Sequence, residues 1–160
     1  MNTVLIDNEY LAVTLPEGFD DIPHKELESL IGITYDSLWG VRDTDRHMLM
    51  YMTWKDSSKL LNKLASEKAI AKRADKHFAK CYPGSGYASE DLPERAVTGS
   101  DAGAHGFHFS YTIQGVDQEG EVWVLKHGKR CYTMCYYTRS EVAEQNRPVI
   151  DGILSSLEVR

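Results

Sequence analysis

The sequence predicts an α+β fold, an α/β/α sandwich around a mainly antiparallel sheet. Three observations support this prediction. Several strand-like segments in the second half are joined by connections too short for a parallel crossover. Segments with helical spacing lie before and after these strands. The strand-like segments 107–113 and 131–137 carry apolar side chains at both odd and even positions, and so on both faces of the sheet. This indicates that helices cover both faces.

The composition is that of one soluble globular domain over residues 1–160. This length is enough to bury a continuous core without disulfides or metal, and no window approaches the roughly 18 apolar residues that a membrane-spanning helix needs. The N-terminus has no basic start and its apolar run breaks at Asp7, so we expect no signal peptide. The cysteines Cys81, Cys131 and Cys135 form no Cys-x-x-Cys pair, which favours a reducing compartment. We therefore expect a cytoplasmic protein.

Two strands and a short helix are predicted first. Residues 10–15 combine β-branched and aromatic side chains and stop at the turn-forming Pro16-Glu-Gly-Phe19, and a short strand over residues 3–6 precedes them. Pro23 suits the first turn of a helix that ends before Gly32. The apolar stripe of this helix is expected to consist of Leu27, Leu30 and Ile31.

A hairpin and a long helix are predicted next. Residues 38–42 and 48–54 flank a segment rich in Asp and Thr, which suits a turn. Every second residue of the later strand is large and apolar, and we interpret this row as core rather than as an adaptable binding surface: Met48, Met50, Met52 and Trp54. Residues 57–81 have helical spacing, with a second helix start at Ser66-Glu67.

The second half is expected to form an antiparallel meander. Pro83-Gly-Ser-Gly86 predicts a loop that extends to about Leu92. Strands follow, with turns at 117–120 and 127–128 between them, and their ranges are 107–113, 121–125 and 131–137. Connections this short require antiparallel neighbours.

A final helix is predicted from Ser140, a residue type that caps helix N-termini well. Proline disrupts a helix interior, so Pro148 is expected to divide this helix or to open its main part. The buried face is expected to contain Val149, Ile150, Ile153, Leu154 and Leu157.

The order of these elements and two short sequence motifs resemble those of the PsbP/Mog-like fold. The motifs are Leu15-Pro-Glu-Gly-Phe19 and Ile153-Leu-Ser-Ser-Leu157. Members of that superfamily include a lumenal photosystem II subunit, a binding partner of the Ran GTPase and bacterial chaperones for type VI secretion effectors. The resemblance therefore implies a non-catalytic protein-binding, adaptor or chaperone-like domain, and it assigns no functional residue.

Groups that carry chemistry are few and scattered. His77 and Cys81 lie four residues apart on the predicted helix and so share a face, but no neighbour in sequence completes the three or four ligands that zinc requires. His105 and His108 would point to opposite sides of a strand. No phosphate-binding glycine motif is present. We therefore expect no metal, no cofactor and no catalytic residue.

The alternative hypothesis is a small enzyme or apolar-ligand carrier whose site forms only in three dimensions. Its groups are His77, Cys81 and several residues of the predicted sheet that could line a pocket: Tyr111, Trp123, Tyr132, Met134 and Tyr136. Core beneath a helix is the competing interpretation of these sheet residues.

Charge is distributed unevenly along the chain. The net charge is −6, yet residues 55–80 contain eight Lys/Arg against three acids, whereas residues 1–54 contain three against ten. Four lysines recur at every fourth position and so align along one side of the predicted helix: Lys68, Lys72, Lys76 and Lys80. This stripe is either a solvated face or a contact surface for an acidic protein partner. Nucleic acid is not expected, because the isoelectric point is near 5.5 and no aromatic residues are paired with the cations.

Overall fold

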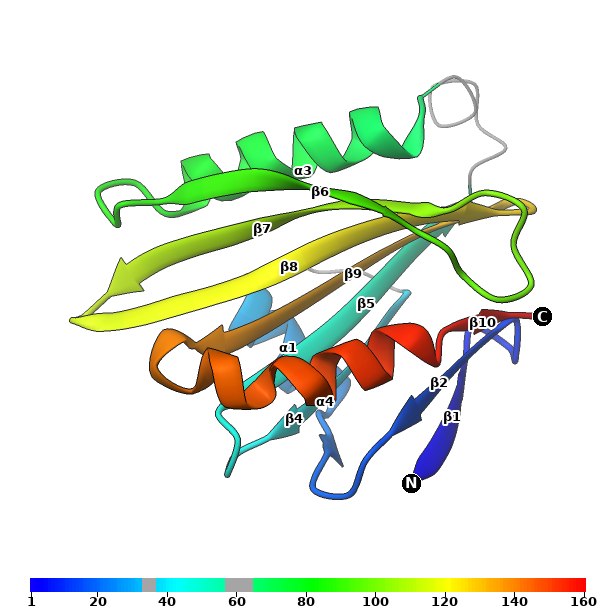
Figure 1. Ribbon diagram of the computed structural model, residues 1–160, viewed down its shortest axis with the longest axis horizontal. Helices are drawn as coiled ribbons and strands as arrows, with labels where there is room; N and C mark the ends of the chain where they lie inside the picture. The colour runs from blue at the N-terminus through cyan, green and yellow to red at the C-terminus, as the bar shows by residue number, and fades with distance from the viewer. Residues whose placement is uncertain (33–36, 57–64) are drawn as a thin grey trace.

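The computed structural model describes residues 1–32, 37–56 and 65–160, and its strands form two antiparallel sheets (Figure 1). The larger sheet has seven strands, which in spatial order are β3 (Asp20–Asp21), β4 (Leu38–Asp43), β5 (Met48–Asp56), β9 (Arg130–Arg139), β8 (Val116–His127), β7 (Ala104–Ile113) and β6 (Ala88–Arg95). The smaller sheet has the order β1 (Asn2–Ile6), β2 (Leu11–Leu15) and β10 (Glu158–Val159). The predicted meander is confirmed, because β7, β8 and β9 pair in sequence order.

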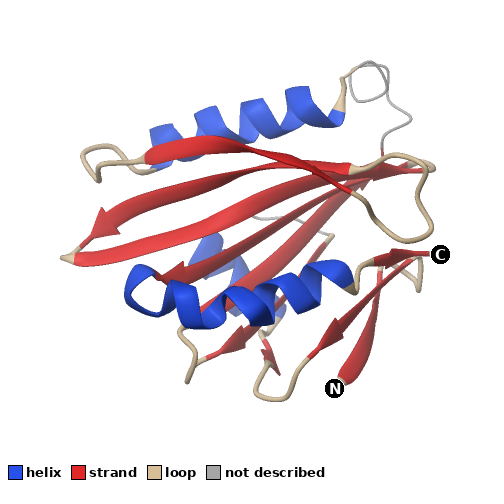
Figure 2. Ribbon diagram, viewed as in Figure 1, coloured by secondary structure: helices blue, strands red, loops and turns tan. Residues whose placement is uncertain are grey.

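Helices cover both faces of the larger sheet, as Figure 2 shows. Helices α1 (His24–Ile31) and α3 (Glu67–Cys81) pack on one face. Helix α4 (Ala143–Ser155), which follows a 3₁₀ turn over Ser140–Val142, packs on the other face together with the smaller sheet. The predicted α/β/α sandwich is therefore confirmed.

The core beneath α4 contains the residues predicted for it. The methionine row of β5 is buried, with Met50 fully inaccessible, and it meets the apolar stripe of α4 and the inner face of β2. The buried residues of the stripe are Ile150, Ile153 and Leu154; Leu157 is buried just beyond the end of α4, and Val149 is only partly buried. Burying side chains of this size stabilises the fold by roughly 1.5–3 kcal/mol each, so the C-terminal segment holds the two sheets together.

An aromatic core lies beneath α3 on the opposite face. Phe107 and Phe109 of β7 are buried, and Phe78 of α3 packs against both. The ring centroids of Phe78 and Phe109 are 5.4 Å apart, within the range in which aromatic pairs attract each other beyond simple burial. The predicted helical positions Ile70, Ala74 and Phe78 face this core, whereas residues 57–64 of the predicted helix lie outside the described residues.

Helix α1 has the predicted boundaries and a narrower buried face than predicted. Pro23 precedes it, and Gly32 ends it in the left-handed conformation with φ 70°. Leu27 is buried against Gly40, where any Cβ would collide with the leucine side chain. Leu30, however, is 54% exposed, so its predicted place in the buried stripe is wrong. A helix of eight residues turns only one narrow side to the sheet.

The predicted loop up to Leu92 is wrong, because residues 88–95 form β6. This strand is at the edge of the sheet, is exposed along most of its length and contains Pro93. Edge strands need no apolar alternation and often carry charge and proline, so the sequence of β6 looks like that of a loop. Asp75 of α3 fixes its start by accepting hydrogen bonds from Tyr87 and Ser89.

The predicted turn at 117–120 is also misplaced, whereas the turn at Gly128 is confirmed. The chain reverses at Gln114 and Gly115, which both have positive φ, as a tight hairpin turn requires. Gly120 lies inside β8, where a Cβ would collide with the backbone carbonyl of Tyr136 on β9. Glycine at this position therefore permits close strand approach and does not form a turn.

The start of α4 differs from the prediction. Ser140 is not the N-cap of α4: it begins a 3₁₀ turn, and Val142, the residue before α4, makes no side-chain capping hydrogen bond. Pro148 lies within α4, which continues on both sides of it. Buried Asn146 donates hydrogen bonds to the Arg46 carbonyl and to Thr138 Oγ1, at 2.8 and 2.9 Å. These tertiary contacts hold the first turns of the helix in place despite the proline.

Candidate functional site

The lysine stripe lies on a helix whose formation the sequence explains well. Ser66 caps α3 by accepting a 3.1 Å hydrogen bond from the Ala69 amide, as predicted. Glu67 in the first turn and Lys80 in the last turn both suit the helix dipole. The apolar face of α3 packs on β7 and β8, which turns the opposite face to solvent.

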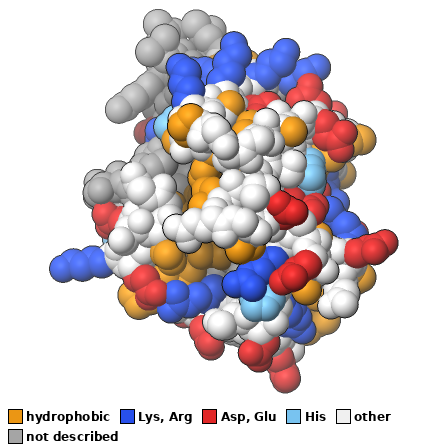
Figure 3. Space-filling view, turned by 90° about the vertical axis from the view of Figure 1, so that its left-hand side faces the viewer, with side chains coloured by type: hydrophobic (Ala, Val, Ile, Leu, Met, Phe, Trp, Pro, Cys, Tyr) orange, Lys and Arg blue, Asp and Glu red, His pale blue; other side chains and the backbone are white. Residues whose placement is uncertain are grey.

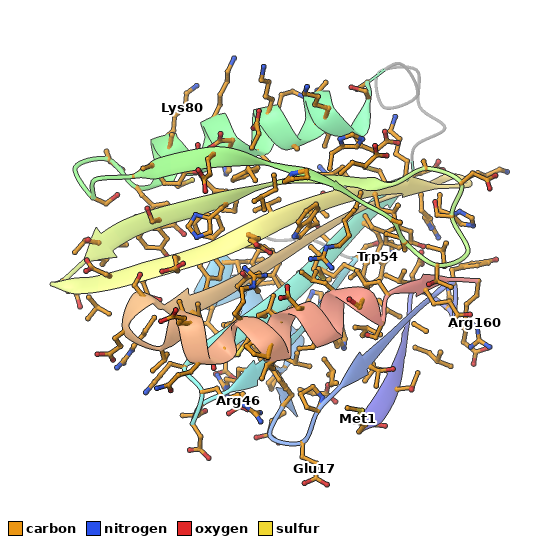
Figure 4. The ribbon with its side chains drawn as sticks, viewed as in Figure 1. Met1, Glu17, Arg46, Trp54, Lys80 and Arg160 are labelled. Atoms are coloured by element: carbon orange, nitrogen blue, oxygen red, sulfur yellow. The ribbon has the colours of Figure 1, made fainter. Side chains whose placement is uncertain are left out.

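All four lysines of the stripe are exposed on that outer face. Figure 4 shows Lys80 on the side of α3 away from the sheet, and Figure 3 shows Lys and Arg side chains along the top of the molecule, over α3. From Lys68 to Lys80 the stripe is about 18 Å long at the rise of an α-helix. Within the described part of the chain, none of these lysines forms an ion pair.

The two ends of the stripe have different surroundings. Lys68 and Lys72 border a shallow groove whose other side carries Asp91 and Glu94 of β6. These carboxylates attract the nearby ammonium groups and reduce the field that the first half of the stripe presents to a partner. That groove includes neither Lys76 nor Lys80. The acids of the groove therefore lie beside the first half of the stripe, whereas Asp75 of α3 directly precedes Lys76 in the second half.

A hollow of about 390 Å³ opens beyond the C-terminal end of α3. Its aromatic wall consists of Tyr82, Tyr111 and Tyr137, with the Tyr82 and Tyr111 rings stacked 4.2 Å apart. Burial raises the pKa of the Tyr111 and Tyr137 phenols above its ordinary value near 10. Leu49 and the exposed Leu30 add apolar surface to the hollow. The lining also includes the charged side chains of Arg42, Asp43 and Arg139, so the hollow has an apolar wall beside polar groups.

A second hollow, of about 400 Å³, lies alongside α3 over β5 and β9. His77 lines it, and His77 Nε2 lies 3.4 Å from Cys81 Sγ, as the shared helix face predicted. Cys131 and Cys135 also line this hollow, but burial raises the pKa of both thiols, that of Cys135 to about 12. Neither buried thiol is therefore a reactive thiolate near neutral pH.

The residues named for the alternative hypothesis do not gather at one place. Tyr132, Met134, Tyr136 and Trp123 belong to the core beneath α4, as the competing interpretation predicted. Tyr111 lies on the other face of the sheet, in the hollow that His77 does not line. The alternation of side chains along each strand did not show this. The register between neighbouring strands decides whether the odd or the even positions of each strand lie on the same face of the sheet.

His105 and His108 have acidic partners on neighbouring strands. Nε2 of His108 is 2.9 Å from Glu119 on the neighbouring strand, and Nε2 of His105 is 3.7 Å from Glu94. Across residues 1–32, 37–56 and 65–160, no group of three or more His, Cys, Asp or Glu side chains could hold a metal ion. None of the helices in these ranges is long and apolar enough to cross a membrane.

Sequence reasoning missed the hollow at the end of α3. Its wall comes from separate segments, because Leu30 lies in the last turn of α1, Tyr82 follows α3, and Tyr111 and Tyr137 lie on β7 and β9. The only local signal was Leu30, an apolar residue two positions before the glycine that ends a short helix. Its spacing is equally consistent with a buried position.

No protein family model matches the sequence, and no curated protein matches it. Solved structures do resemble it. Cyanobacterial PsbP (CyanoP) from Synechocystis sp. PCC 6803 has a TM-score of 0.67 at 15% sequence identity, and the match covers 99% of this chain and 92% of that one. The Ran-binding protein Mog1p of Saccharomyces cerevisiae has a TM-score of 0.61 at 11% identity, covering 99% and 96%.

A further similar structure is LpqN of Mycobacterium tuberculosis, a protein involved in cell envelope biogenesis. Its TM-score is 0.57 at 10% identity, with 93% of this chain and 82% of that chain covered. The chain therefore has a PsbP/Mog-like fold, and the resemblance noted from its sequence is confirmed. Identities this low establish the fold and assign no function.

Proposed function

We propose that this chain is a non-catalytic protein-binding domain that uses the lysine stripe of α3 to contact an acidic protein. The observation that carries the proposal is a row of four exposed lysines on one helix face of a protein whose net charge is −6. In a chain with excess negative charge, such a positive stripe attracts an acidic surface locally. The rest of the protein repels the same surface, so the partner is directed to the stripe.

The fold is compatible with this function. Mog1p, which has the same fold, is a Ran-binding protein, so this scaffold can support protein recognition. The stripe lies on a helix fixed by Phe78 and by the Asp75 contacts to β6. A rigid helix loses little conformational entropy on binding, which favours its use as a contact surface.

The test compares association rates of two charge-matched variants. After co-purification identifies a partner, Lys68→Glu with Lys72→Glu and Lys76→Glu should slow association at least several-fold and flatten its salt dependence. A control with Lys25→Glu, Lys129→Glu and Arg160→Glu changes the net charge equally at other exposed sites. This control should keep a faster association and a steeper salt dependence than the stripe variant. Equal rates and salt slopes for the two triple variants would rule out the stripe as the contact surface.

A second candidate function is the binding of an apolar ligand in the hollow beside Tyr82. Its support is the stacked pair of Tyr82 and Tyr111 at the wall of a hollow that also exposes Leu30. An environment-sensitive hydrophobic dye should bind there, and Tyr111→Ala should weaken binding at least several-fold. Binding that is unchanged by Tyr111→Ala would exclude this hollow.

We also propose that the protein acts in the cytoplasm. All three cysteines are free, and Cys81 is exposed. An exposed free thiol persists more readily in a reducing compartment than in an oxidising one. Fractionation of the native cells, with detection of the protein in the soluble cytoplasmic fraction, tests the proposal, and recovery from the periplasm or envelope would contradict it.

A further inference from the structure

Strand β1 has an unpaired outer side. The order of the smaller sheet is β1, β2, β10, and β1 pairs only with β2 among the described strands. In Figure 1, β1 lies at the outside of the molecule, on the side away from α3. The backbone N–H and C=O groups that point away from β2 can therefore accept another strand.

The other edge strands of the two sheets carry features that discourage such pairing. Strand β3 has only two residues, both aspartates. Strand β6 contains Pro93 and three acids within eight residues. Strand β10 is bridged to Thr98, whose carbonyl accepts a 2.9 Å hydrogen bond from the Val159 amide. Short length, charge, proline and coverage are the usual protections of an edge.

Strand β1 has none of these protections. Its sequence, Asn2-Thr-Val-Leu-Ile6, contains no charged residue, no proline and no glycine. Two of the six large apolar side chains that the described chain exposes also lie here, Leu5 (42%) on β1 and Met1 (94%) directly before it; Figure 4 labels Met1 at the start of β1. An open edge and exposed apolar side chains thus occur at the same place.

We propose that β1 pairs with β1 of a second copy of this chain, antiparallel about a two-fold axis. The three-stranded sheets of the two copies would then form one six-stranded sheet. In the register centred on Val4, Asn2 lies opposite Ile6 of the other copy, and Thr3 lies opposite Leu5. Both Thr3 and Leu5 are exposed in the single chain, so pairing removes apolar surface from water.

A second copy suits this edge better than an acidic or basic partner. A charged segment would gain no electrostatic attraction from a strand without charge. A two-fold axis through the Val4 pair, in contrast, brings the two copies of each of Thr3, Val4 and Leu5 within about 8 Å of each other, so a charge at one of these positions would repel its own equivalent. The absence of charge from β1 removes that penalty, and the acidic composition of β6 shows what an edge that opposes self-pairing looks like.

The dimer should be weak and should depend on concentration. Five strand residues extend about 17 Å, so pairing of β1 alone buries less surface than a standard stable interface. The expected behaviour is a reversible monomer–dimer equilibrium. The lysine stripe is on the other side of the molecule (Figure 1) and takes no part in it.

Sedimentation equilibrium of the full chain tests the proposal. The weight-average mass should rise from the monomer value of 18.1 kDa toward twice that value with concentration. Leu5→Lys places two like charges near the axis and should raise the dissociation constant at least ten-fold. Ile113→Lys is the matched control, because Ile113 is also a strand residue and is also 42% exposed, and it should leave the equilibrium unchanged.

Hydrogen exchange supplies a second measurement that does not depend on a variant. The outward amides of β1 should become more protected as concentration rises, while β6 amides should not. A wild-type chain that is monomeric up to about 1 mM would overturn the proposal, as would equal dimerisation of the Leu5→Lys variant. The lysine-stripe variant should dimerise normally, so failure of this proposal and failure of the proposed function are distinguishable.

Discussion

The phenol of Tyr132 donates a 2.8 Å hydrogen bond to Asp7 Oδ2, which joins the β1–β2 turn to β9 across 125 positions of the chain. Arg130 Nε donates to the same oxygen at 3.0 Å. The Asp7 carboxylate is almost completely buried, although it belongs to a turn. Asp7 therefore fixes the position of the smaller sheet against the larger one, as a buried carboxylate requires partners of this kind.

Removal of the Asp7 carboxylate should destabilise the protein. Asp7→Ala leaves the buried Tyr132 hydroxyl without its acceptor and also places alanine at a φ of 53°, so we expect the free energy of unfolding to fall by about 1–3 kcal/mol. Asp7→Asn should cost less, because asparagine retains an acceptor oxygen and tolerates the left-handed conformation. Chemical denaturation measures both, and equal losses would show that the hydrogen bonds contribute nothing.

Truncation of the α4 stripe should be costly. Leu154→Ala removes a side chain that is 2% exposed within the core shared by both sheets, and we expect a loss of about 2–5 kcal/mol. Leu30→Ala is the matched control, since Leu30 is also helical but is 54% exposed; it should change stability by less than about 0.5 kcal/mol. A Leu154→Ala loss no larger than the control would mean that α4 is not docked in solution.

The elements that sequence predicts well are those in which one physical requirement dominates. The methionine row of β5 alternates because one face of the strand packs beneath α4, and the stripe from Ile150 to Leu154 has helical spacing because α4 packs on a sheet. Pro23 and Gly32 mark the ends of α1 through backbone conformation alone. In each case a local pattern and the tertiary structure agree.

The errors arise where tertiary contacts decide. Strand β6 forms because β7 and α3 hold it, although its own residues favour a loop. Glycine at position 120 suggests a turn in the sequence, but it is needed there because β9 passes too close for any Cβ. The hollow beyond the C-terminal end of α3 is lined by segments far apart in the sequence, which no local pattern connects. The lysine stripe could be predicted from the sequence because it lies on one helix. The acids across the groove from Lys72 could not, because Asp91 and Glu94 belong to β6.

Thiol labelling should distinguish the three cysteines. Cys81 is exposed, whereas Cys131 and Cys135 are buried and have raised pKa values because burial disfavours the thiolate. We expect one thiol to react rapidly with a maleimide in the folded protein and three to react in denaturant. The Cys81→Ser variant should lose the rapid reaction. Rapid labelling of two or more thiols in the native wild type would contradict the burial of β9.

Stability should fall steeply in alkaline solution. Burial raises the pKa of several tyrosines above the ordinary value near 10, with Tyr51 and Tyr137 among the most strongly affected. The unfolded chain therefore releases phenolic protons at a lower pH than the folded chain does. The stabilisation is fully present below about pH 10 and is lost as the pH rises toward the folded-state values, by up to about 1.4 kcal/mol per pH unit for each such phenol.

Denaturant unfolding at a series of pH values, together with tyrosinate absorbance, measures this effect. The free energy of unfolding should decline above about pH 10, and tyrosinate absorbance should increase mainly as the protein unfolds. Tyr51→Phe removes one of the affected phenols and should make the decline shallower, because the variant has one fewer proton to release on unfolding. If all nine tyrosines ionised near pH 10 while the chain stayed folded, the aromatic core beneath α3 would have to be open to water in solution.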